Sequence, residues 1–198
     1  MRVIEHSPED PVPAIVYLLG YPGVGKYTVG RELARRMGAI LIDSQVVNHP
    51  ILALFDWDGK SQLPEGTFDR AEPIREAVFS ALEDIAPKQM SYIFTNVLED
   101  KSTDLAIYER LKGVASRRGS VFVPVMLTCA VDVRLRRVQS QERVRRFKIA
   151  DSKGVMHLMT TTPLYTPDDP ELLTIDTTSL APEQSASRIL DSIERRTR

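Results

Sequence analysis

The sequence predicts an α/β fold in which a parallel sheet of about five strands carries helices on both faces. Two observations predict this fold class. Short apolar runs alternate with segments whose apolar residues recur at helical spacing, and a glycine-rich turn joins the first run to the first helical segment. Parallel strands need long crossover connections, which are usually helices. In such folds the carboxyl ends of the strands lie together, and ligands bind there.

The first strand and the segment after it carry the most specific pattern in the chain. The apolar run Ala14–Leu19 is typical of a strand buried on both faces, and it leads directly into a glycine-rich segment. Beyond that segment, apolar residues recur at helical spacing until Gly38, which predicts a helix over 26–37. The order of strand, glycine loop and helix is the context that a phosphate-binding loop requires.

Four further strands and three helices are predicted downstream. The strands cover residues 39–42, 92–97, 121–127 and 172–175, and apolar stripes predict helices over 74–85, 105–115 and 186–193. Pro73 and Pro182 fit the first turns of the first and last of these helices. Pro124 lacks a backbone donor, which hints at a bulge or a sheet edge within its strand.

Composition limits the size and the partners of the molecule. The chain has 198 residues, of which 42% are hydrophobic, so we expect one core and a single domain over 1–198, as a monomer or a homodimer. The net charge of −1 gives no bulk attraction to nucleic acid or to an anionic membrane. No segment is apolar for long enough to cross a bilayer.

The single cysteine and the first residues favour a cytoplasmic location. Residues 1–13 contain charges and prolines but no apolar signal region. Cys129 has no partner for an internal disulfide, as is usual in a reducing compartment. Its apolar surroundings predict a core position rather than a nucleophile. The three histidines are scattered without the spacing of zinc ligands.

The glycine-rich segment matches the phosphate-binding pattern G-x-x-x-x-G-K-[ST] with one departure. It consists of Gly20, Tyr21, Pro22, Gly23, Val24, Gly25, Lys26, Tyr27 and Thr28. Its glycines let backbone N–H groups converge on phosphate oxygens, and the helix N-terminus and Lys26 add positive charge. Tyr27 stands where the pattern has a hydroxyl that ligates magnesium. The loop therefore predicts a nucleotide site, and Tyr27 leaves open how a metal is held there.

Residues 20–35 resemble the opening of the P-loop small-molecule and nucleoside monophosphate kinases, the group that includes shikimate kinase, gluconate kinase and chloramphenicol phosphotransferase. The resemblance continues in three segments: residues 41–43, a strand that ends in an acid; residues 132–143, similar to an arginine-bearing lid; and residues 173–178 with Pro182, similar to the turn on which such kinases seat adenine. It implies the P-loop NTPase fold with a small acceptor lobe and a lid.

The resemblance also implies transfer of the γ-phosphoryl group of ATP, with Mg²⁺ as a cofactor, to a hydroxyl of a small molecule. In that reaction the protein aligns donor and acceptor and neutralises charge on the phosphoryl oxygens. Lys26 would bridge the β- and γ-phosphates, and Thr28 would hydrogen-bond the α-phosphate. Asp43 would accept the acceptor's proton or hold a magnesium-bound water. The alternative for Asp43 is an N-cap of the helix that follows.

A basic run supplies the expected lid, which covers about 132–160. Its seven cations lie within fifteen residues: Arg134, Arg136, Arg137, Arg143, Arg145, Arg146 and Lys148. We expect Arg137 and Arg143 to neutralise the transferring charge and the other cations mostly to be solvated. Only Phe147 is interleaved with them, and a single-stranded nucleic-acid site would need more aromatics. The run therefore disfavours nucleic acid as a partner.

The acceptor lobe, about 44–75, matches no single activity. Its candidate acceptor-binding residues are Asn48, His49, Asp56, Trp57, Asp69, Arg70 and Arg75. The two arginines would suit an anionic acceptor. Trp57 would either stack on a substrate or attach the lobe to the body of the protein.

Two departures from the kinase pattern keep a second function open. Tyr27 replaces the expected serine, and Asn96 stands where such kinases often have an acid near the end of the third strand. Both weaken direct ligation of magnesium, although magnesium usually keeps several waters. The alternative to a kinase is a nucleotide-binding regulatory module with weak or no turnover. Lys26, the acceptor lobe and the cationic lid favour the kinase.

Overall fold

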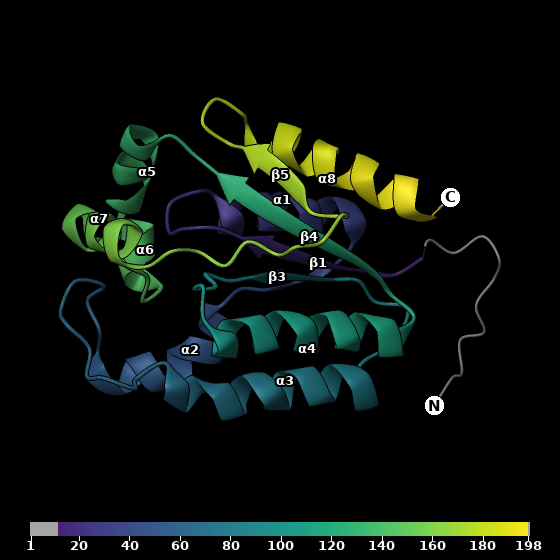
Figure 1. Ribbon diagram of the computed structural model, residues 1–198, viewed down its shortest axis with the longest axis horizontal. Helices are drawn as coiled ribbons and strands as arrows, with labels where there is room; N and C mark the ends of the chain where they lie inside the picture. Colours follow the sequence, from purple (N-terminus) through teal and green to yellow (C-terminus); the bar gives the residue numbers. More distant parts are fainter. Residues whose placement is uncertain (1–11, 198) are drawn as a thin grey trace.

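The computed structural model describes residues 12–197, and the five predicted strands form one sheet (Figure 1). The strands are β1 (Ala14–Leu19), β2 (Ile40–Ile42), β3 (Tyr92–Thr95), β4 (Val121–Thr128) and β5 (Leu173–Asp176). All neighbouring strands are parallel, in the order β2-β3-β1-β4-β5. The predicted fold class is confirmed. The prediction that residues 1–13 contain no signal region concerns mostly residues 1–11, which lie outside the described residues.

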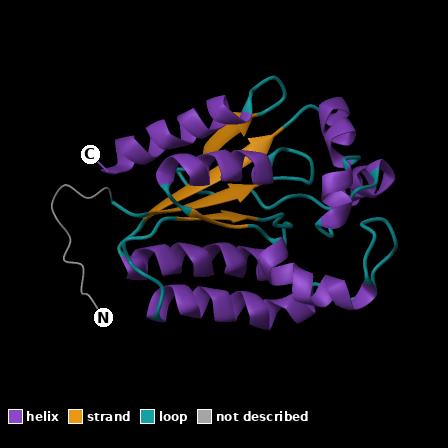
Figure 2. Cartoon of the chain, turned by 180° about the vertical axis from the view of Figure 1, so that it is seen from behind, coloured by secondary structure: helices purple, strands orange, loops and turns teal. Residues whose placement is uncertain are grey.

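Helices cover both faces of the sheet, and a further group lies beyond its carboxyl edge (Figures 1 and 2). One face carries α1 (Lys26–Met37) and α8 (Pro182–Thr197), and the other carries α3 (Glu72–Asp84) and α4 (Ser102–Arg118). At the carboxyl edge lie α2 (Gln45–Leu52) and the 3-10 turns η1 (Ala53–Phe55) and η2 (Asp69–Ala71). The segment predicted to be a lid also lies there and forms α5 (Val131–Val138), α6 (Gln141–Arg145) and α7 (Ser152–Thr161). None of the helices between residues 12 and 197 combines the length and apolar character that crossing a membrane requires.

The side-chain alternation of β1 divides the core into two halves. Every residue of β1 is buried, because the strand lies at the centre of the sheet. Alternate residues from Ala14 onward pack with α1 and α8, and those from Ile15 onward pack with α3 and α4. This explains why the strand is apolar throughout rather than alternating. Cys129 is buried in the first half of the core, as predicted.

The strand that contains Pro124 is not an edge strand, since β4 lies between β1 and β5, but the proline itself lies where the sheet has a local edge. Pro124 stands opposite Tyr17 of β1, but the pairing of β4 with β5 begins one residue later, at Val125 and Leu173. The strand therefore has a neighbour on only one side at the proline, where a missing N–H is tolerated. The placement of Pro73 and Pro182 in the first turns of α3 and α8 is confirmed.

A buried arginine holds the end of α3 against α4. Arg118, the last residue of α4, is 4% exposed. Its guanidinium donates to the carbonyl oxygens of Leu82, Ala86 and Pro87. These carbonyls belong to the last turn of α3 and the chain after it, where helix geometry leaves acceptors without partners. The Arg118 side chain thus donates hydrogen bonds to buried carbonyl oxygens that would otherwise have no partner.

We expect Arg118→Met to lower the free energy of unfolding by about 2–4 kcal/mol, because it leaves several buried carbonyls without donors. Urea denaturation followed by circular dichroism measures the change. Arg117→Met is the matched control. The Arg117 side chain is 57% exposed, and its ion pair with Glu83 is worth at most about 1 kcal/mol. Equal losses in the two variants would contradict this role of Arg118.

Candidate functional site

The glycine loop, residues 20–28, joins β1 to α1 at the carboxyl edge of the sheet. Gly20 and Gly23 have φ angles of 134° and 89°, which side chains rarely tolerate. A Cβ at Gly20 would collide with the carbonyl oxygen of Leu127, and one at Gly23 would lie 2.7 Å from Cγ of Arg134. Glycine is therefore required here both by the backbone angles and by the close approach of β4 and α5.

Lys26 begins α1 and folds back over the loop. Its ammonium donates to the carbonyl oxygens of Gly20 and Tyr21, the second at 2.9 Å. Burial lowers the pKa of Lys26 well below its usual range, and the nearby charges of Lys148 and Arg143 lower it further. Negative charge placed in the loop would favour the protonated lysine. The surroundings of Lys26 thus favour an anion at this point.

Asp43 follows β2, as predicted, and its carboxylate is 4% exposed. It accepts hydrogen bonds from the hydroxyl of Thr95 at 2.6 Å, from Arg146 at 2.6 Å and from Lys148 at 2.9 Å. Burial alone would raise the pKa of Asp43, but Lys148, Thr95 and Arg146 together hold it below its ordinary value. The N-cap position of α2 belongs to Ser44, so the capping alternative for Asp43 is wrong.

Tyr27 contacts the same cations. The guanidinium carbon of Arg146 lies 3.3 Å from the centroid of the Tyr27 ring, and Nζ of Lys148 lies 5.2 Å from it. Arg146 therefore stacks on the loop tyrosine and at the same time forms an ion pair with Asp43. We refer to Tyr27, Asp43, Arg146 and Lys148 as the cation cluster.

The backbone between the two cations is held in an unusual conformation. Phe147 has a φ of 47°, in the left-handed region that residues other than glycine rarely adopt. Its carbonyl oxygen accepts a hydrogen bond from the side chain of Gln45 at 3.0 Å, and its ring packs edge-on against His49 at 4.8 Å. Contacts with α2 thus stabilise the turn that brings Arg146 and Lys148 to one carboxylate.

The structure separates the two arginines expected to act in the lid. Arg143 lies close enough to Lys26 to lower its pKa, and its Nε donates to the carbonyl oxygen of Ile149 at 2.9 Å. Arg137 instead donates to the carbonyl and hydroxyl oxygens of Thr177, just after β5. The role of either arginine in charge neutralisation stays a prediction. The sequence did not single out Arg146 and Lys148 as site residues. Spacing on a continuous helix does not predict the turn at Phe147 that brings these two cations together.

The turn after β5 lies against the glycine loop. The hydroxyl of Thr177 donates to the carbonyl oxygen of Val24 at 2.8 Å, and α8 begins at Pro182 a few residues later. The segment predicted to seat adenine is therefore tied directly to the loop. Thr28 is exposed at the start of α1, and its contact with a phosphate stays a prediction.

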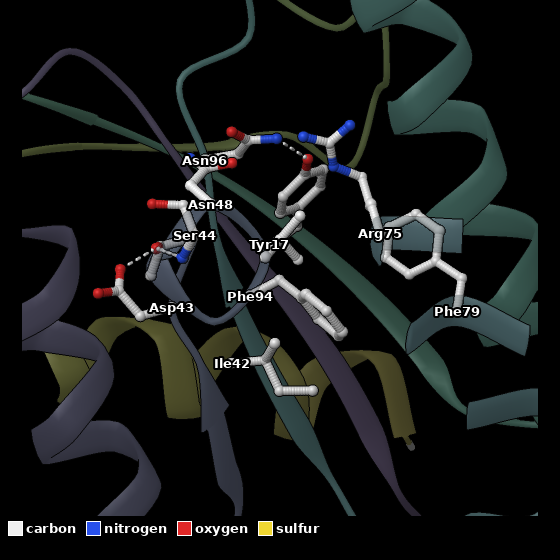
Figure 3. Close-up of a pocket in the computed structure, with 11 residues that line it drawn as sticks. Tyr17, Ile42, Asp43, Ser44, Asn48, Arg75, Phe79, Phe94 and Asn96 are labelled. Atoms are coloured by element: carbon white, nitrogen blue, oxygen red, sulfur yellow. Dashed lines mark hydrogen bonds between the residues drawn. The ribbon is translucent and has the colours of Figure 1, made fainter. Parts of the chain in front are cut away.

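A small hollow that is open to solvent lies beside Asp43 (Figure 3). Asp43, Asn48 and Arg75 give it polar walls, and the rings of Phe79 and Phe94 give it an apolar wall. Of the predicted acceptor-binding residues, Asn48 and Arg75 line this hollow. It therefore brings residues of the acceptor lobe together with the acid at the end of β2.

The polar end of the hollow is formed by Tyr17, Asn96 and Arg75 (Figure 3). The amide of Asn96 donates to the phenolic oxygen of Tyr17 at 3.0 Å, and its own oxygen accepts from the N–H of Val97. Burial raises the pKa of Tyr17, so that the phenol keeps its proton at neutral pH. Burial also lowers the pKa of Arg75, since its guanidinium is half-buried beside the phenol. This end thus offers hydrogen-bond donors to a ligand.

The other predicted acceptor residues lie outside the hollow. Trp57 is 9% exposed and donates through its indole N–H to the carbonyl oxygen of Ser61 at 2.7 Å, so it fastens its own turn in the lobe and is not free to stack. His49 packs against Phe147, and Arg70 is exposed on η2. Asp56 and Asp69 are also exposed. Their binding roles stay predictions.

The donors near the loop fit magnesium poorly. Magnesium prefers oxygen ligands in octahedral geometry. Both oxygens of Asp43 are hydrogen-bonded to cations, Tyr27 presents its ring to Arg146, and the side chain of Asn96 is bonded to Tyr17 and Val97. Within residues 12–197, no three acidic, histidine or cysteine side chains gather into a possible metal site. The arrangement of these oxygen atoms therefore does not support the sequence-based prediction that Asp43 binds magnesium.

Part of the chain is similar in sequence to a kinase. A 51-residue stretch is 45% identical to the shikimate kinase of Paracidovorax citrulli (strain AAC00-1), and it spans 23% of this chain and 28% of that protein. The chain thus matches well under two thirds of this curated relative.

The fold as a whole is similar to solved kinase structures. A sugar kinase from Janibacter sp. HTCC2649 aligns with a TM-score of 0.62 and 16% identity over 92% of this chain and 95% of that chain. An APS kinase from Mycobacterium tuberculosis, in complex with AMPPNP and APS, aligns with a TM-score of 0.56 and 19% identity over 93% and 99% of the two chains. At these identities the similarity shows the P-loop kinase fold.

The family model AAA_18, described as an AAA domain, matches residues 16–153. The match contains most of β1, the glycine loop, Asp43 and the segment with Arg146 and Lys148. It covers well over half of the chain. The chain therefore belongs to the AAA_18 family of AAA domains.

Proposed function

We propose that the protein is an ATP-dependent phosphotransferase that moves the γ-phosphoryl group to a hydroxyl of a small molecule. One observation carries the proposal: Asp43 lines the hollow and also binds Lys148, which lies close enough to Lys26 of the glycine loop to lower its pKa. Phosphates in the loop and an acceptor hydroxyl in the hollow would therefore meet at Asp43. The family and the kinase fold of the similar structures support the same reading.

In this proposal the chain contributes position and charge. The loop N–H groups and Lys26 hold the β- and γ-phosphates, Thr28 contacts the α-phosphate, and the lid cations neutralise charge that spreads over the γ-phosphoryl oxygens. Asp43 accepts the proton of the acceptor hydroxyl. Its pKa is held low by Arg146 and Lys148, and it would rise once these cations bind phosphate instead, since burial favours the protonated acid.

The hollow favours a compact acceptor with one anionic group. Arg75 supplies positive charge at one end, although one of its nitrogens is paired with the exposed Glu72. Asn96 and the protonated Tyr17 lie beside it, and Phe79 and Phe94 form a surface for a ring or a carbon skeleton. A carboxylate or a phosphate would bind the guanidinium of Arg75 with its hydroxyl directed to Asp43. We therefore propose a hydroxylated anionic metabolite as the acceptor.

A second function, a nucleotide-binding regulatory module with weak or no turnover, is favoured by the ion pairs of the cation cluster. Asp43 is fully engaged by Arg146 and Lys148, and Tyr27 offers its ring where a metal-binding hydroxyl is usual. A protein of this kind would bind ATP without transferring phosphate. Turnover measurements distinguish the two functions.

We expect ATP to be consumed only with an acceptor present when the protein is incubated with pooled hydroxylated carboxylates and sugar phosphates. Coupled detection of ADP measures the rate, and mass spectrometry identifies the phosphorylated product. Lys26→Ala should lower the rate by about 100-fold or more, because it removes the charge that stabilises the transferring group. Measurable ATP binding without acceptor-dependent ADP release would exclude the kinase and favour the regulatory module.

Once an acceptor is found, Arg75→Met should raise its KM by about 10- to 100-fold, because a charged hydrogen bond contributes about 1.5–3 kcal/mol. The KM for ATP should stay within about twofold, since Arg75 lies at the acceptor end of the hollow. Lys60→Met is the matched control, as Lys60 belongs to the same lobe, is exposed and is not a candidate acceptor-binding residue. If both variants leave the acceptor KM unchanged, Arg75 does not bind the anionic group.

A further inference from the structure

The position after the loop lysine is occupied by an aromatic ring with a cation stacked on it. In phosphate-binding loops a hydroxyl at this position ligates the magnesium ion that contacts the β- and γ-phosphates. Here the guanidinium carbon of Arg146 lies 3.3 Å from the centroid of the Tyr27 ring, which is van der Waals contact. A planar organic cation therefore fills the space beside Tyr27.

The second cation, Lys148, contacts both oxygens of the same carboxylate. Nζ of Lys148 is 2.9 Å from one oxygen of Asp43 and 2.8 Å from the other, and Arg146 binds the latter oxygen at 2.6 Å. Thr95 completes the set with a hydrogen bond to the first oxygen. A metal ion bound to Asp43 would have to displace at least one of these bonds.

The site has more positive charge than its carboxylate can balance. The charge of Asp43 acts on Lys26, Arg143 and Lys148, it is paired with Arg146, and Arg134 also lies within range of Lys26. Four cations thus act on one carboxylate, and Arg134 adds a fifth positive charge near Lys26. A metal-free triphosphate carries about four negative charges at neutral pH, and one magnesium ion cancels roughly two of them. The local surplus matches the metal-free form better than the magnesium complex.

The arginine has unused hydrogen-bonding capacity, and the backbone that carries it is held in place. Among the described residues, the Nε–H of Arg146 is buried and has no partner. A buried donor without an acceptor is costly, and an anion bound beside it would remove that cost. Phe147 holds the turn next to Arg146 through Gln45 and His49, so the backbone that carries the guanidinium is in place before any ligand arrives.

We infer that this chain binds the nucleotide phosphates without a protein-held magnesium ion, and that Arg146 and Lys148, stacked on the ring of Tyr27, neutralise the β- and γ-phosphates in its place. The inference rests on the proposed function, because it requires a nucleotide in the glycine loop. In this arrangement Tyr27 takes the place of the usual metal-binding hydroxyl because its ring supports the guanidinium of Arg146. Its ring serves as a platform, and its hydroxyl is not a metal ligand.

This arrangement also couples nucleotide binding to the acid of the site. Arg146 and Lys148 neutralise Asp43 when the loop is empty, and they turn toward the phosphates when ATP binds. Asp43 is thereby released beside the acceptor hollow. The same two side chains therefore hold the buried carboxylate before binding and the triphosphate after it.

Isothermal titration calorimetry with ATP, in EDTA and in excess magnesium, tests the inference on the full chain. We expect the two dissociation constants to agree within about threefold. Binding that requires magnesium, with affinity in EDTA more than about tenfold weaker, would overturn this inference and leave the proposed function standing. Absence of ATP binding in both buffers would overturn the proposed function and the inference together.

Matched variants identify the groups that replace the metal. In EDTA, Arg146→Ala and Lys148→Ala should each weaken ATP binding by about tenfold or more, since each removes a charged hydrogen bond and leaves Asp43 less neutralised. Arg145→Ala is the control, because Arg145 is exposed and adjacent in the chain. Equal effects of Arg145→Ala and Arg146→Ala would show a general loss of positive charge and contradict the specific role.

Two substitutions at the tyrosine separate the ring from the hydroxyl. Tyr27→Phe keeps the ring and should retain most of the affinity in EDTA. Tyr27→Ser should weaken binding in EDTA by about 3- to 30-fold, the size of a partly desolvated cation–π contact, and should make binding respond to magnesium. If Tyr27→Phe behaves like Tyr27→Ser in EDTA, the hydroxyl is the active group and the inference is wrong. Thermal melts of both variants establish that they fold.

Discussion

The carboxylate of Asp43 is buried where three separate parts of the chain meet, and it is stabilised there by Thr95, Arg146 and Lys148. A buried charge of this kind is tolerated only when its partners are in place, and removing one typically costs about 3–5 kcal/mol. The position of the lid segment therefore depends on this acid at the end of β2. The rest of the site follows from that constraint.

Through the ion pairs of Asp43, the sheet, the acceptor lobe and the lid share one point of contact. The loop contributes Tyr27, whose ring supports Arg146, and the lobe contributes α2, whose side chains hold the turn at Phe147. The lobe also bonds the lid further along, where the N–H of Ala150 donates to the carbonyl oxygen of Gly59 at 3.0 Å. A change at any of these contacts should shift side chains at the glycine loop, because the interior is closely packed.

The electrostatics of this edge suit the phosphate site proposed for the glycine loop, even with an unusual residue in that loop. A chain with a net charge of −1 has no general attraction for polyanions, so selectivity comes from cations gathered at one place. Lys26 shows the effect of this crowding, since burial and its cationic neighbours lower its pKa. Bound phosphate would relieve that repulsion, and the site is accordingly organised around a ligand with several negative charges.

Local sequence patterns were enough to predict the sheet, the order of its elements and the glycine loop, because apolar periodicity, glycine positions and helix-start prolines act over a few neighbouring residues. They also placed Asp43 at the carboxyl edge. Which cations of the basic run reach that acid depends on tertiary contacts. Arg146 and Lys148 do so through the left-handed backbone of Phe147, while Arg137 binds Thr177. Those outcomes depend on contacts between residues about a hundred positions apart, such as Gln45 with Phe147, and local patterns carry no information about such contacts.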